Sequence, residues 1–194
     1  MNHERYALVG WLAIAGAVLI VPAMILARVY DQDPTTHAVL LPAIMSLGFT
    51  GTGLSLYPLF RFRQLLNERY RYHGSDGRIM LLIAGGVVAA LVSILGRLFS
   101  PLLGPDALVP FFLVLLAVGV PLAFLGLSLG SSLLRIDTDL GGFRRPLAYT
   151  VIAASLCFVT VVLTPIGFLL LAAADILLGL IFLREESVSG PEFV

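Results

Sequence analysis

A single acidic residue inside a long apolar run is the first candidate for chemistry in this sequence. Asp175 lies between Ile166 and Leu183, and every other residue of that run is uncharged. An aspartate at the centre of a bilayer costs about 2.5 to 3.5 kcal/mol on insertion scales, so it indicates a functional site by default. The Leu, Ile and Phe residues of the same run favour insertion by about 5 kcal/mol together, which exceeds this cost. The run can therefore cross a membrane with its acid in place.

Two hypotheses for Asp175 stay open, and both involve a partner. Arg97 is the expected partner because Leu98 and Phe99 extend the apolar stretch beyond it, which places its guanidinium below the outer interface. The functional hypothesis is a protonatable or cation-binding site on a transport pathway. The structural hypothesis is an ion pair with Arg97, or a protonated acid that is hydrogen-bonded between helices.

An arginine-rich segment, residues 61–73, is the second candidate. Its apolar residues follow helical spacing, while charged and polar residues occupy much of the remaining circumference, which predicts an amphipathic extension of the preceding helix. One interpretation is a site that binds anionic lipid headgroups or a cytoplasmic partner. The other is a solvated helix end whose charges only fix the topology. The candidate lipid- or partner-binding residues are Arg61, Arg63, Arg69 and Arg71.

Other motifs that could carry chemistry are weaker. Gly126-Leu-Ser-Leu-Gly130 matches the nucleophile-elbow pattern around Ser128, but that pattern needs a strand-turn-helix context and a histidine base. All three histidines lie outside the apolar runs, so we interpret the motif as a small-residue face for helix packing. Asp137 and Asp139 are interpreted as part of a solvated loop with internal ion pairs.

Metal and cofactor sites are not expected either. Within the apolar runs no two histidines, cysteines or carboxylates have the i, i+3 or i, i+4 spacing that a helical metal site uses. The single cysteine, Cys157, allows no disulfide framework. With 12 basic and 12 acidic residues, the chain shows no sign of nucleic-acid binding.

The elements that must position these residues are helices in a membrane. Hydrophobic residues make up 59% of the 194 positions and charged residues 12%, about half the charge of a soluble domain. Four apolar runs have about the 20 residues that a spanning helix needs. A fifth, residues 147–183, would be about 55 Å long as one helix, against roughly 30 Å of hydrocarbon, so it must fold back. Thr164-Pro165-Ile166-Gly167 is the expected hinge.

The sequence therefore predicts an all-α polytopic membrane protein. We expect one integral membrane domain over residues 1–194, a bundle of six transmembrane helices with a tight hairpin at Pro165 between the fifth and the sixth. The expected spans are residues 7–27, 38–58, 79–97, 107–129, 147–164 and 166–183.

The arginines predict the orientation. The chain has no lysine, and with the N-terminus inside only Arg28 and Arg97 lie on the outer side, which is a strong positive-inside bias. Both termini are then cytoplasmic, in a cell (plasma) membrane. An arginine-only basic set with abundant Ala, Gly, Leu and Val is typical of a prokaryotic protein, and hence of the inner membrane. The ten inner arginines are Arg5, Arg61, Arg63, Arg69, Arg71, Arg78, Arg135, Arg144, Arg145 and Arg184.

Two functions from different classes fit these observations. The first is a non-catalytic accessory or scaffold subunit that contacts membrane lipids, other membrane subunits or a second copy of the chain. The alternative is a small proton, cation or solute transporter or channel that uses Asp175. Short loops and a single intramembrane acid favour the first, because transporters usually place several polar groups near the midplane. An enzyme is the least expected class.

Overall fold

The computed structural model describes residues 4–32, 36–103, 108–136, 140, 142–160 and 162–188. All regular structure in these residues is helical, which confirms the predicted all-α fold with six helices. Five of the helices, all except α5, are long and apolar enough to cross a membrane, so the chain is a multi-pass membrane protein. The helices are α1 (Glu4–Gln32), α2 (His37–Tyr70), α3 (Asp76–Leu103), α4 (Leu108–Leu134), α5 (Arg144–Val159) and α6 (Thr164–Val188).

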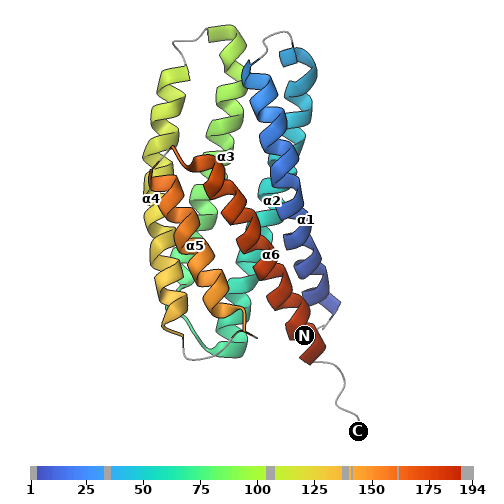
Figure 1. The fold of residues 1–194 in the computed structure, drawn as a ribbon, viewed down its shortest axis with the longest axis vertical. Helices are drawn as coiled ribbons and strands as arrows, with labels where there is room; N and C mark the ends of the chain where they lie inside the picture. The colour runs from blue at the N-terminus through green and yellow to red at the C-terminus, as the bar shows by residue number, and fades with distance from the viewer. Residues whose placement is uncertain are drawn as a thin grey trace.

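The helices form a ring in chain order. Each one packs against the next, α6 returns to α1, and α6 also contacts α2. Among the described residues α1 and α4 are not neighbours, so the ring closes only through α5 and α6. The start of α1 and the end of α6 lie at the same end of the bundle, which we call the terminal end (Figure 1).

The α5–α6 hairpin is shorter than the rest of the bundle. It rises from the terminal end and turns about halfway up, whereas α1 to α4 continue to the opposite end (Figure 1). With 16 residues, α5 is about 24 Å long and does not match a hydrocarbon core of roughly 30 Å. The predicted hairpin is present, and the described residues of its turn are Thr160, Val162 and Leu163, so the expected hinge at Thr164 to Gly167 belongs to the start of α6 instead. Pro165 falls in the first turn of α6, where its missing N–H removes no helical hydrogen bond.

The contact between α4 and α5 gives the depth of this turn. A Cβ on Gly126 of α4 would meet the hydroxyl of Ser155 on α5, so these two residues face each other. The described turn residues, Thr160, Val162 and Leu163, lie five, seven and eight positions beyond Ser155 in the sequence. Because α4 and α5 are antiparallel, the turn is level with residues 118–121 of α4. These residues are close to the centre of the apolar run 107–129.

The buried core is concentrated at the terminal end. All six helices contribute to it. The extension of α2 predicted for residues 61–73 is helical as far as Tyr70, and the apolar side chains of Phe62, Leu65 and Leu66 are turned into the bundle. Phe182 is fully buried and its ring stacks on that of Tyr6, with 6.0 Å between centroids. The cluster consists of Val9, Phe62, Leu65, Leu66, Ile79, Leu129, Leu133, Ile136, Leu140, Leu147, Ala148, Ala174, Leu178, Ile181 and Phe182.

Glycines set the closest helix contacts. Where α1 crosses α6, a Cβ on Gly179 would lie 2.7 Å from the carbonyl oxygen of Gly10, so neither position has room for a side chain. On α4, a Cβ on Gly130 would lie 2.9 Å from the carbonyl oxygen of Ala148 on α5. The small-residue face predicted for Gly126 to Gly130 is thereby confirmed as a packing surface.

Candidate functional site

Asp175 is buried between α6 and α2. Its side chain is 7% exposed, and the hydroxyl of Ser55 donates a hydrogen bond of 2.7 Å to its Oδ2 atom. In the described part of the chain Ser55 is its only hydrogen-bond partner, and no cation pairs with it. Small residues bring α2 into place: Gly16 of α1 lies against Leu54, and Gly86 of α3 lies against Leu56. The carboxyl group is therefore held by a neutral donor in a tightly packed layer.

Arg97 lies elsewhere, and the predicted pairing with Asp175 is wrong. The guanidinium of Arg97 bonds to Oδ1 of Asp31 at 2.9 Å and lies 5.5 Å from the ring centroid of Tyr30. The physical reason is position along α3: Arg97 is close to the end away from the terminal end, where α1 ends and α2 begins. There its long side chain reaches an interfacial acid without entering the bundle.

The surroundings of Arg97 form a small polar cluster with an apolar wall. The Tyr30 hydroxyl donates to the Arg97 carbonyl oxygen at 3.2 Å, and the Tyr30 ring stacks on His37 with centroids 4.1 Å apart. A pocket of about 410 Å³ opens here. Its remaining lining comes mainly from α3 and α4 and includes Phe111 and Phe112.

The arginine-rich segment is tied to the rest of the bundle. Arg63 bonds to Asp76 at the start of α3, with 3.1 Å between Nε and Oδ1, and Asn67 donates to the same carboxylate at 2.8 Å. Arg69 forms an ion pair with Glu185 on α6, and the Tyr70 hydroxyl donates to that carboxylate as well.

The other two arginines of the segment have local roles. Arg61 donates to Gln64 within the same helix, and Arg71 ends α2 in the left-handed conformation, with φ of 50°. Three of the four predicted lipid- or partner-binding arginines therefore contact side chains of the same chain. The contacts of Arg63 and Arg69 link α2 to α3 and to α6.

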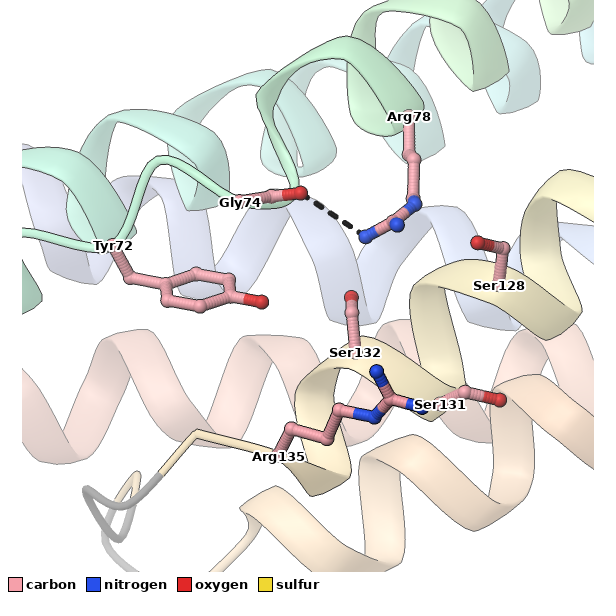
Figure 2. Close-up of a pocket in the computed structure, with 7 residues that line it drawn as sticks. All are labelled: Tyr72, Gly74, Arg78, Ser128, Ser131, Ser132 and Arg135. Carbon is pink, nitrogen blue, oxygen red and sulfur yellow. Dashed lines mark hydrogen bonds between the residues drawn. The ribbon is translucent and has the colours of Figure 1, made fainter.

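A polar pocket that the sequence analysis did not predict lies at the terminal end. It has a volume of about 390 Å³ and lies between the α2–α3 turn and the last turns of α4 (Figure 2). Four of its residues have the i, i+3, i+4, i+7 spacing of one helical face: Ser128, Ser131, Ser132 and Arg135. This spacing is visible in the sequence and could have indicated a polar face at the end of α4. The sequence did not indicate that α3 also lines this pocket. The lining residues are Tyr72, Gly74, Arg78, Ser128, Ser131, Ser132 and Arg135.

The described residues offer no catalytic or metal-binding arrangement beyond these features. Within them, no group of three or more His, Cys, Asp or Glu side chains could hold a metal ion. Asp137 and Asp139, predicted to form a solvated loop, lie outside the described residues. Ser128 lies on α4 in a helical context, without the strand-turn-helix geometry of a nucleophile elbow. Comparison with models of known protein families, with curated proteins and with solved structures finds no match for this chain.

Proposed function

We propose that this chain is a non-catalytic accessory or scaffold subunit of a membrane assembly. The observation that carries the proposal is the depth of the α5–α6 turn, which is level with the centre of the apolar run of α4. Val162 in this turn is 85% exposed. Irregular backbone exposed to lipid does not occur in the hydrocarbon region, and it is tolerated only where protein or a water-filled cavity covers it. A membrane partner, or a second copy of the chain, supplies that cover.

The chemistry of the turn suits an apolar partner. The Thr160 hydroxyl donates to the Cys157 carbonyl oxygen at 2.8 Å, and the Thr160 backbone N–H donates to the carbonyls of Leu156 and Phe158. Pro165 brings no N–H that would need an acceptor. Because the turn satisfies several of its own polar groups, its cover can be largely apolar. The exposed side chains of Leu163, Ile166 and Leu169 add apolar contact area beside the turn.

The orientation is part of the proposal. The terminal end carries Arg61, Arg63 and Arg69 together with the polar pocket, and the opposite end carries Arg97. Under the positive-inside rule the terminal end faces the cytoplasm of a prokaryotic cell, and both termini are cytoplasmic. The hairpin then enters the membrane from the cytoplasmic side, and its cover comes from within the membrane.

A photo-crosslinking amino acid at position 162 tests the proposal in the native membrane. Val162 is expected to give a discrete adduct whose mass identifies a membrane protein or a dimer of the chain. Val39, which is also strongly exposed but lies on α2 near the opposite end, is the matched control and is expected to react with lipid. Lipid adducts alone at position 162, at the same yield as at position 39, would contradict an accessory role based on the turn.

A transporter is the second candidate, and the burial of Asp175 against a single hydroxyl favours it. A buried acid with one neutral partner is a group that can exchange a proton. Neither of the two pockets described above includes Asp175 in its lining, which is why we place this function second.

A flux measurement separates the two candidates. The purified chain in proteoliposomes is expected to show no pH-dependent or cation-dependent flux above that of empty vesicles. Asp175→Asn, which keeps the shape but cannot ionise, is expected to change nothing in this assay. Flux in the parent chain that disappears in Asp175→Asn, while the variant stays folded in detergent, would establish the transporter instead.

A further inference from the structure

We infer that the polar pocket at the terminal end binds a phosphate group. Two guanidinium groups, those of Arg78 on α3 and Arg135 after α4, line one space of about 390 Å³. None of the lining residues that the structure describes is acidic. Among the described residues, the acid nearest to Arg78 in the sequence is Asp76, and it is engaged by Arg63 and Asn67 of α2. The described lining of the pocket therefore gathers two positive charges without an acidic side chain, and an anion offsets their repulsion.

The available donors match the acceptors of a phosphate. Arg78 uses one N–H for the carbonyl of Gly74, at 3.0 Å, and each guanidinium carries five N–H donors. The polar ends of Arg78, Arg135 and Tyr72 point toward the region around Ser132 from three different parts of the chain (Figure 2). The planar donor pairs of arginine fit two phosphate oxygens at once.

The serines divide into structural groups and one free hydroxyl. Ser132 bonds to the Leu129 carbonyl oxygen and to the hydroxyl of Ser75, at 2.8 Å and 2.9 Å, and both serines are buried. Ser131 donates to the carbonyl oxygen of Leu127. The bond between Ser75 and Ser132 joins the α2–α3 turn to α4, whereas the other two bonds lie within α4. In the described structure Ser128 and Tyr72 keep their hydroxyls for a ligand.

Two sources can supply the phosphate. The pocket lies where α3 begins and α4 ends, which is the depth at which the headgroup of a phospholipid is found when the two helices span the membrane. A soluble phosphate compound can reach the same end from the aqueous side. A volume of about 390 Å³ is within the range of small-molecule sites. The shared chemistry is a phosphate held by two arginines, and the inference does not depend on which assembly the chain joins.

Binding to the purified full-length chain in an uncharged detergent tests the inference. We would measure the affinity for dihexanoyl phosphatidic acid and for inorganic phosphate at constant ionic strength, with dihexanoylglycerol as the phosphate-free control. Saturable binding of both phosphate probes identifies the phosphate group itself as the ligand. Binding of phosphatidic acid alone identifies a lipid headgroup. If neither probe binds, or dihexanoylglycerol binds as tightly as phosphatidic acid, the inference is overturned.

Arginine variants assign the binding to this pocket. Arg135→Gln and Arg78→Gln should each weaken binding about tenfold or more, because each removes charge-assisted hydrogen bonds. Arg135 is exposed, so its replacement should leave the fold intact even if Arg78→Gln does not. Arg145→Gln is the matched control, an exposed arginine at the same end that does not line the pocket, and it should leave the affinity within about twofold. An equal loss in Arg145→Gln and Arg135→Gln would show only nonspecific charge attraction and would refute the site.

Discussion

The two ends of this bundle are built differently. At the terminal end six helices close into a ring around a buried apolar cluster, and ion pairs of Arg63 and Arg69 join α2 to α3 and α6. At the opposite end only α1 to α4 remain, because the α5–α6 hairpin turns halfway (Figure 1). The described polar contacts there are few and centre on Arg97.

This difference shows where the stability of the fold should reside. In lipid, apolar surface alone does not drive helices together, so association depends on close packing and on polar contacts. The terminal end has both. The opposite end has many exposed apolar side chains, such as Phe49, Leu113 and Val109, that can contact lipid or another protein at little cost. We therefore expect substitutions to have large effects at one end and small effects at the other.

Removing a buried aromatic ring at the terminal end should have the largest effect. Phe182→Ala leaves a cavity in the cluster and should lower the free energy of unfolding by about 3 to 5 kcal/mol. Phe49→Ala, at an exposed position on α2 nearer the opposite end, should change it by about 0.5 kcal/mol or less. Reversible unfolding in mixed detergent micelles measures both. Comparable losses in the two variants would mean that the opposite end is packed as firmly as the terminal end.

The glycine contact between α1 and α6 gives a smaller effect of a different kind. In Gly179→Ala the new methyl group would meet the carbonyl oxygen of Gly10 at 2.7 Å, and two helix backbones would have to separate. We expect a loss of about 1 to 3 kcal/mol in the free energy of unfolding.

Gly119→Ala is the matched control for this substitution. Gly119 lies in α4 at the level of the hairpin turn, and a Cβ there would meet nothing within 4 Å. Alanine should stabilise α4 by up to about 1 kcal/mol, because it has the higher helix propensity. Destabilisation by Gly119→Ala in detergent would indicate that a second copy of the chain already contacts this surface.

The sequence was sufficient for the number of helices because their signal is local, but in the described structure only five of the six predicted spans are long enough to cross a membrane. Lengths of apolar runs gave six helices, and the excess length of residues 147–183 required a hairpin near Pro165. The height of the hairpin was not predictable in the same way. It depends on which residues of α4 and α5 face each other, and the contact between Gly126 and Ser155 is a tertiary one.

The candidate sites show the same limit. The isolation of Asp175 in an apolar run predicted an important buried acid. In the structure this side chain is buried. Its partner is Ser55, which is 120 positions away and resembles many other serines in the sequence. Arg97 was assigned to Asp175 because it was the nearest intramembrane cation by hydropathy, but Asp31 is its neighbour in space. Long-range contacts of this kind can be predicted only when the relative register of the helices is known.

The smallest expected difference between the two ends lies in their ion pairs. At the terminal end Arg63 and Asp76 make two contacts, Nε–Oδ1 at 3.1 Å and Nη2–Oδ2 at 3.4 Å, and Asn67 donates to the same carboxylate. At the opposite end Arg97 makes one contact with Asp31, whose side chain is more than half exposed. A bidentate geometry strengthens a pair, and exposure to water and salt weakens it.

Double-mutant cycles measure this difference directly. Arg63→Gln combined with Asp76→Asn should give a coupling energy of about 1 kcal/mol, and Arg97→Gln combined with Asp31→Asn about 0.5 kcal/mol or less. High salt should reduce the second coupling more than the first, because screening acts most on exposed charges. If the pair of Arg97 and Asp31 proved the stronger, charged contacts would stabilise the four-helix end at least as well as the ring. The contrast between the two ends would then rest on the apolar core alone.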